Sequence, residues 1–160
     1  MHDSLLSFCQ WLEQLSWVTA IANSPTMSPA VAVAHFFSFF LLVGTIAVID
    51  LRLLGLAGRR QTLTQLAEPL FPWTWTGLGI AVLSGFFMFA PEAASFFYNA
   101  FFWVKLLVIL PGVVFALIVQ RNLRRWEELP AMPFLAKLAA FISLALWIGV
   151  LLAALEVANY

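Results

Sequence analysis

Four long apolar stretches dominate the sequence, and each is long enough to cross a lipid bilayer. They occupy residues 30–52, 70–90, 100–122 and 134–156. About 20 predominantly apolar residues are needed for a membrane-spanning helix, and a backbone in lipid must satisfy its own hydrogen bonds. The sequence therefore predicts an all-α integral membrane protein, a four-helix bundle with up-and-down topology that forms one domain over residues 1–160.

Composition supports this fold and excludes several function classes. Hydrophobic residues make up 63% of the chain and charged residues 10%, whereas soluble domains are about a quarter charged. The formal net charge of +0 argues against nucleic-acid binding, which needs a basic surface. Phosphate-binding, nucleophile-elbow and zinc-protease motifs are absent from the sequence, so we do not favour an enzyme. The expected partner is the lipid bilayer.

Basic residues predict the orientation of the bundle. Seven of the eight Lys and Arg residues follow the first span or flank the loop between the third and fourth spans: Arg52, Arg59, Arg60, Arg121, Arg124, Arg125 and Lys137. Loops rich in Lys and Arg stay in the cytoplasm. We therefore expect a multi-pass protein of the bacterial inner membrane with both termini in the periplasm.

Residues 1–25 form a segment of a different kind. Leu5, Phe8, Leu12 and Leu15 recur at helical spacing, with polar residues between them. This pattern predicts an amphipathic helix that lies in the outer membrane interface.

Two ionisable side chains, His35 and Lys105, lie five residues inside the predicted spans and away from their ends, where each costs roughly 2.5–3.5 kcal/mol and marks a candidate functional site. His35 and Lys105 both lie about 8 Å below the outer boundary, at 1.5 Å per helical residue. The functional hypothesis requires that they face one another inside the bundle. The alternatives are that Lys105 reaches outward to the surface and that His35 hydrogen-bonds a neighbouring helix.

Other polar or soft side chains complete the set of candidates. Met88 and Glu156 lie at the outer ends of the second and fourth spans and are candidates for the same site; the alternatives are core packing for Met88 and solvation for Glu156. At the inner end of the first span, Asp50 and Arg52 are expected to form a local structural ion pair.

Small residues recur on one face of the second span and one face of the fourth. They are Gly77, Ala81 and Gly85, followed by Ala145, Gly149 and Ala153. Such faces let helices approach closely, and we interpret them as packing surfaces.

Several motifs resemble a family of small bacterial four-helix inner-membrane proteins of unknown function. They include the run from Ala34-His35-Phe36-Phe37 to Asp50-Leu51-Arg52, the Pro72-Trp73-Thr74-Trp75 segment and Lys105-Leu106-Leu107. More distantly, His35, Arg52 and Lys105 resemble positions in two four-helix groups, the haem-binding HemJ-type protoporphyrinogen oxidases and the CopD-type copper-handling proteins. The second resemblance implies haem or copper as the ligand.

The hypotheses for function follow from these candidates. The first is a membrane electron-transfer protein that binds haem b, because haem suits the core of a helical bundle and takes histidine as an axial ligand. In this hypothesis His35 binds the iron, and the other residues around the haem are Lys105, Met88 and Glu156. The second is a cofactor-free accessory subunit of a larger membrane complex. Copper bound by His35 and Met88, and a quinone site at His35 and Lys105, are further alternatives. A homo-oligomer is compatible with each of them.

Overall fold

The computed structural model describes residues 2–58 and 60–158, and every regular secondary-structure element within these ranges is a helix. Four long helices form the bundle: α3 (Met27–Leu53), α5 (Phe71–Phe89), α7 (Ala100–Glu127) and α8 (Phe134–Ala158). By length and composition, all four can span a membrane, α5 together with the short helices that flank it. The prediction of an all-α fold with four spans is therefore confirmed, with the third helix continuing beyond its predicted end at residue 122.

Local sequence signals explain where these helices begin and end. Pro72 lies in the first turn of α5, where its missing N–H leaves no hydrogen bond unmade. The Asn99 side chain caps α7 by accepting hydrogen bonds from the backbone N–H groups of Phe101 and Phe102 at 2.9 and 3.2 Å. Pro91 follows α5 and lies in the short 3-10 helix η1 (Ala90–Glu92).

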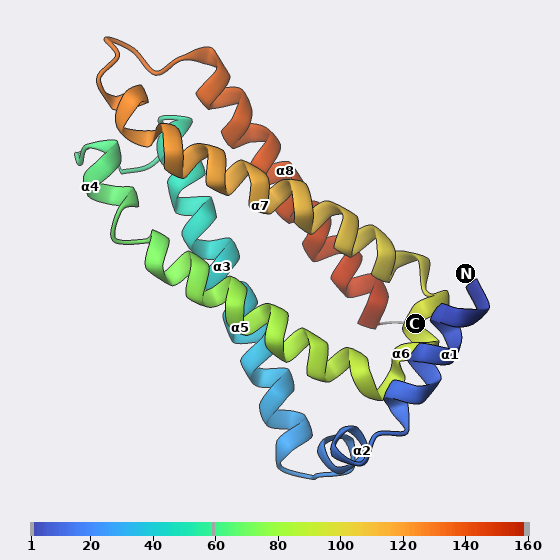
Figure 1. Cartoon of the computed structure of the whole chain (residues 1–160). Coiled ribbons are helices and arrows are strands. Elements are labelled where there is room, and N and C mark those ends of the chain that lie inside the picture. Colours follow the sequence, from blue (N-terminus) through green and yellow to red (C-terminus); the bar gives the residue numbers. More distant parts are fainter. Residues whose placement is uncertain (1, 59, 159–160) are drawn as a thin grey trace.

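The long helices are arranged as two pairs that converge at one end. Neighbours alternate in direction along the chain, α3 packs along α5, α7 packs along α8, and α3 against α8 joins the pairs. Figure 1 shows the pairs meeting near the short helix α4 (Leu63–Ala67) and separating towards α6 (Ala93–Tyr98). We refer to these as the α4 end and the α6 end of the bundle.

Three clusters of buried hydrophobic side chains divide the interior into levels. The α4-end core includes Ile49, Leu53, Leu63, Val119 and Leu123. The middle core consists of Leu42, Ile46, Ala116, Trp147 and Val150. The α6-end core consists of Cys9, Leu12, Val18, Ala90 and Ala93 and belongs to the short helices that cross that end.

Two short helices, α1 (His2–Glu13) and α2 (Ser16–Ala22), occupy the N-terminal segment that the sequence predicts as one helix. The chain breaks at Leu15, whose backbone is extended with φ −66° and ψ 133°. The buried side of α1 packs against η1 and α6, and the Glu13 carboxylate accepts a hydrogen bond from the backbone N–H of Ala94 at 2.7 Å. The first helix is thus fastened to the bundle by its own chain.

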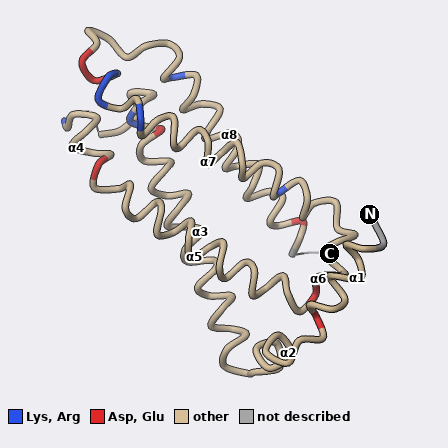
Figure 2. Tube along the Cα trace, viewed as in Figure 1, with Lys and Arg blue, Asp and Glu red and all other residues tan. Residues whose placement is uncertain are grey.

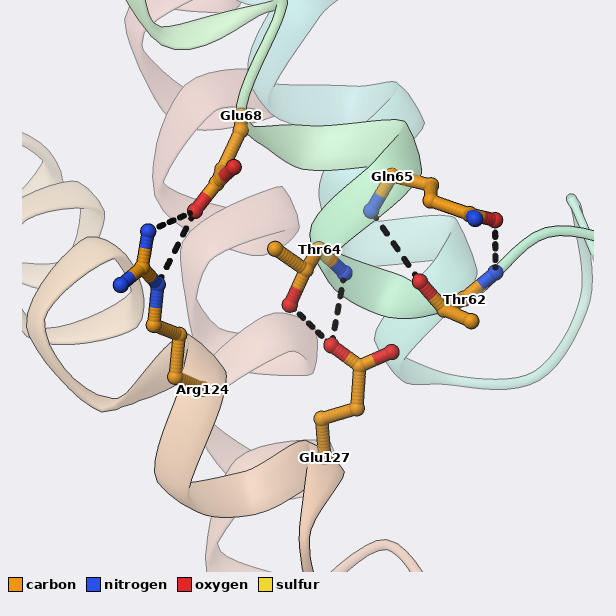
Figure 3. Close-up of polar contacts among 6 residues, drawn as sticks. All are labelled: Thr62, Thr64, Gln65, Glu68, Arg124 and Glu127. Atoms are coloured by element: carbon orange, nitrogen blue, oxygen red, sulfur yellow. Dashed lines mark hydrogen bonds and ion pairs between the residues drawn. The ribbon is translucent and has the colours of Figure 1, made fainter.

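At the opposite end, α4 is fastened to the end of α7 (Figure 3). A reciprocal capping box begins α4: the Thr62 hydroxyl accepts from the backbone N–H of Gln65, and the Gln65 side chain accepts from that of Thr62. The Glu127 carboxylate also accepts hydrogen bonds from Thr64, from its N–H at 3.1 Å and from its hydroxyl. These contacts place a negative charge at the positive end of the helix.

Charged residues are distributed unevenly along the bundle (Figure 2). Lys and Arg gather at the α4 end, and Lys105 on α7 is the exception within the described residues. In the same region the Arg124 guanidinium forms an ion pair with Glu68 at 2.7 Å, with both side chains largely exposed. Arg59, one of the residues behind the predicted orientation, lies outside the described residues.

Candidate functional site

His35 on α3 is held against α5 by two hydrogen-bond acceptors. Its Nδ1 lies 3.0 Å from the backbone carbonyl oxygen of Ala81 and 3.1 Å from the Ser84 hydroxyl oxygen. The Ser84 hydroxyl donates its own hydrogen to the Ile80 carbonyl at 2.6 Å, so it can only accept from His35. We therefore assign the proton to Nδ1, which leaves the Nε2 lone pair of the neutral ring free.

Small residues on α5 make this arrangement sterically feasible. A Cβ atom at Gly85 would lie 3.0 Å from Cε1 of His35, and one at Gly77 would lie 3.0 Å from the backbone oxygen of Ser38. The predicted packing role of the small-residue face is therefore confirmed for α5. The same face also receives the His35 ring, a role that spacing alone did not indicate.

Lys105 lies at the same level of the bundle, on α7. It is half-buried and close enough to His35 to interact electrostatically with the ring. No hydrogen bond joins the two side chains, and in the described part of the chain the Lys105 ammonium forms no ion pair. The structure therefore brings an imidazole and an amine without an ion-pair partner to the same level, with no hydrogen bond between them.

Met88 and Glu156, the other predicted members of the site, do not join this group. The Met88 side chain is 36% exposed, and Glu156 is exposed near the α6 end of α8. Neither forms a hydrogen bond or ion pair with His35 or Lys105, although all four residues are described. Their positions near the helix ends, where the two helix pairs separate, account for their exposure.

None of the three buried hydrophobic clusters of the described residues includes a residue adjacent in sequence to His35 or Lys105. Among the described residues, the buried clusters lie on either side of the level that holds these two side chains: the middle core towards α4 and the core of the short helices towards α6. Trp147 of α8 belongs to the middle core, which lies next to this level on the α4 side. Its ring packs on Gly112, is 2% exposed, and leaves Nε1 without a hydrogen-bond partner in the described structure. Sequence reasoning missed Trp147 as a polar group, because it reads as one more large apolar residue.

A groove of about 410 Å³ lies beside the same part of α5. Its walls are almost entirely apolar and come from α2, α3 and α5, including Ala34, Leu83 and Phe87. Ser84, which contacts His35, also lines the groove. A hydrocarbon or isoprenoid chain matches the groove in chemistry.

The donor set at His35 limits the metal chemistry that it can support. Over residues 2–58 and 60–158, no three His, Cys, Asp or Glu side chains form a cluster able to hold a metal ion. An isolated copper ion needs several protein donors. Haem needs only an axial ligand from the protein because the porphyrin supplies the other four nitrogens. One imidazole with a free Nε2 therefore suits haem better than a bare metal ion.

The predicted ion pair between Asp50 and Arg52 is not formed. The Arg52 guanidinium donates to the backbone carbonyl of Gln61 at 2.8 Å, whereas Asp50 is 1% exposed and faces Ser143 of α8. Residues two apart on a helix point in nearly opposite directions, and side-chain pairs form at a spacing of three or four. The prediction was wrong because it relied on proximity in sequence instead of on helical geometry.

Comparisons with known proteins identify a family but no activity. A family model described as a family of unknown function matches residues 15–157. No curated protein and no solved structure matches the chain.

Proposed function

This chain belongs to a family of unknown function, DUF6644, and we propose from the geometry of the site that it is a small membrane redox protein that binds haem b. His35 is the proposed axial ligand of the haem iron. The remote resemblance to HemJ-type proteins, carried by His35, Arg52 and Lys105, supports the same ligand. When bound, haem supplies reversible one-electron chemistry.

The observation that carries the proposal is the hydrogen bonding of the His35 ring. Histidines that bind metals almost always donate their other ring N–H to a carbonyl, carboxylate or water, which fixes the tautomer and the direction of the ring. Here the N–H of Nδ1 is directed at the Ala81 carbonyl and the Ser84 hydroxyl. Nε2 is therefore the atom proposed to bind iron.

Lys105 supplies the second argument. A half-buried ammonium without an ion-pair partner in the described structure provides a counter-charge for a carboxylate such as a haem propionate. The unpartnered Nε1–H of Trp147 is a further hydrogen-bond donor bordering the same level. These residues can orient an amphipathic planar ligand whose ring is apolar and whose edge is anionic.

The proposed setting is the bacterial inner membrane. The clustering of Lys and Arg at the α4 end (Figure 2) supports a cytoplasmic position for that end under the positive-inside rule. The α6 end, with His35 and Lys105 nearest to it, then lies on the periplasmic side. Electron exchange would take place with a partner on that side.

An optical spectrum of the purified protein tests the proposal. The chain is expressed in haem-replete bacteria, purified in mild detergent and examined for a Soret band and for iron content. His35→Ala is expected to abolish the band, and His2→Ala is the matched control, because the chain has two histidines. Lys105→Ala is expected to retain the band and lower the midpoint potential, because removing a nearby positive charge favours the oxidised iron.

Three results would overturn haem binding. They are the absence of a Soret band from the wild-type protein, a band that His35→Ala leaves unchanged, and copper in place of iron. A protein without any cofactor that co-purifies stoichiometrically with other membrane subunits would instead establish the accessory-subunit alternative. Isoprenoid quinone extracted from the wild type, without haem, would establish the quinone alternative.

A further inference from the structure

A second polar site lies in the α4 half of the bundle, away from His35. Asp50 on α3 is 1% exposed, and its Oδ2 atom has no hydrogen-bond partner among the described residues. Ser143 of α8 faces the carboxyl group, is also 1% exposed, and its hydroxyl is likewise unpartnered in that part of the chain. A buried carboxyl group with an unsatisfied oxygen is costly unless something else compensates it.

The Asp50 side chain borders a small hollow between α3, α5 and α7. The hollow has a volume of about 10 Å³, which is close to the space that one water-sized sphere requires. Its two polar lining residues are Asp50 and Thr74, and the others are apolar: Ile46, Ile49, Phe71, Ala116 and Val119. The space therefore suits a single small occupant.

The polar groups around the hollow are acceptors. The Thr74 hydroxyl has its hydrogen engaged, since it lies 2.8 Å from Thr45 Oγ1 and 3.0 Å from the Leu70 carbonyl oxygen. Thr45 in turn donates to carbonyl oxygens of its own helix at 2.9 Å. Asp50 and Thr74 thus bring oxygen lone pairs to the walls of the hollow, and what they lack is a hydrogen-bond donor or a positive charge.

The described residues do not supply that charge. Arg52 lies two residues further along the same helix and donates to Gln61. The side chains that α5, α7 and α8 direct at Asp50 in the described structure are hydroxyl or apolar groups, with no titratable residue among them. Within residues 2–58 and 60–158, Asp50 forms no ion pair. An anionic Asp50 would therefore be isolated in a medium of low polarity.

We propose that this hollow binds one small monovalent cation, held by the Asp50 carboxylate and the Thr74 hydroxyl oxygen, while Ser143 faces the same carboxyl group from α8. Hard oxygen donors of this type suit alkali-metal ions and protons, and either one neutralises the buried carboxylate. The site is separate from the proposed haem site, because the hollow lies where the middle core meets the α4-end core, whereas His35 lies on the α6 side of the middle core. The cation is a metal ion such as Na⁺ or K⁺, or it is a proton, and the experiment separates these cases.

Thermal unfolding of the purified protein in detergent tests this site. In the first series, melting temperatures are compared at constant ionic strength and alkaline pH in NaCl, KCl and N-methylglucamine chloride, whose cation is too large for the hollow. In the second series, the salt is N-methylglucamine chloride alone and the pH is lowered. A ligand that binds only the folded state raises the melting temperature with the logarithm of its concentration. We expect such a rise in the wild type, and Asp50→Asn, whose amide can donate to Thr74, should melt without dependence on the cation.

Matched variants separate the site from general effects of charge. Glu156→Gln removes an exposed carboxyl group and should retain the full dependence of the wild type. A rise with Na⁺ or K⁺ that is lost in Asp50→Asn establishes a metal-ion site, and a rise on acidification alone that is lost in the same variant establishes a proton site. A wild type that responds to neither, or a response that Asp50→Asn retains, overturns the proposal and leaves a neutral water as the occupant.

Discussion

The close approach of α3 and α5 predicts unequal effects of the same substitution at two glycines of one helix. A Cβ atom at Gly77 would lie 3.0 Å from the backbone oxygen of Ser38 and 3.1 Å from the backbone nitrogen of Leu42. Backbone atoms cannot rotate away, so Gly77→Ala must push the two helices apart by several tenths of an ångström. A Cβ atom at Gly79 would meet nothing within 4 Å, which makes Gly79→Ala the matched control.

The magnitude follows from two opposing effects. Overpacking a well-packed contact costs typically about 1–3 kcal/mol. Replacing glycine by alanine in a helix ordinarily stabilises it by about 0.5–1 kcal/mol, but separated helices in a lipid-like medium remain helical, so this gain largely cancels. We expect Gly77→Ala to lower the free energy of unfolding by about 1–3 kcal/mol and Gly79→Ala to change it by less than about 0.5 kcal/mol.

Reversible unfolding in mixed micelles, followed by tryptophan fluorescence as the fraction of denaturing detergent increases, measures these free energies. Gly85→Ala provides an intermediate case, because its Cβ would meet the movable ring of His35 at 3.0 Å. This variant should lose less stability than Gly77→Ala while disturbing any spectrum that depends on His35. Equal stability of the Gly77 and Gly79 variants would refute the close packing of α3 against α5.

Two further predictions concern the ends of the bundle. Burial, together with the nearby Glu13 carboxylate, raises the pKa of the Cys9 thiol. Because little thiolate is then present near neutral pH, Cys9 should react slowly with a maleimide. The control is the double variant Cys9→Ser, Ser4→Cys, whose thiol lies at an exposed position and should react quickly. Equal labelling rates would show that α1 does not stay docked. Glu127→Ala should reduce the free energy of unfolding by about 1 kcal/mol, because it leaves the backbone N–H of Thr64 unpaired. Arg124→Ala should leave the melting temperature unchanged, since its ion pair with Glu68 is exposed to solvent. A larger loss of stability for Arg124→Ala than for Glu127→Ala would contradict this ranking.

The spans were predictable from the sequence because lipid leaves little choice of structure. An apolar stretch of the required length must become a helix, so hydropathy alone located α3, α5, α7 and α8. The short helices α4 and α6 were not predicted, although the Thr62 to Gln65 spacing contains a capping-box signal. Five and six residues are too few for a hydrophobic period to stand out.

The candidate site was predictable only in part. Depth counting placed His35 and Lys105 at one level, because rise per residue is nearly constant in a helix. The partners of His35 depend on how α3 is rotated against α5, and Ala81 and Ser84 lie 46 and 49 residues away in sequence. Rotation also explains Asp50, whose side chain faces Ser143 across the bundle, a contact that no local pattern encodes.

The two polar sites occupy the junctions between hydrophobic clusters, which gives a physical reason for their positions. His35 lies between the middle core and the α6-end core. Asp50 lies where the middle core meets the α4-end core, because the hollow beside it is lined by Ile46 of the middle core and by Ile49 of the α4-end core. Along α3 the two residues are separated by about 22 Å at 1.5 Å per residue. Within a cluster, tight packing excludes a ligand. Between clusters, the ionisable groups meet small or polar neighbours: Ala81 and Ser84 beside His35, and Thr74 and Ala116 beside Asp50. The junctions between the hydrophobic clusters are therefore the places where this bundle accommodates ionisable side chains.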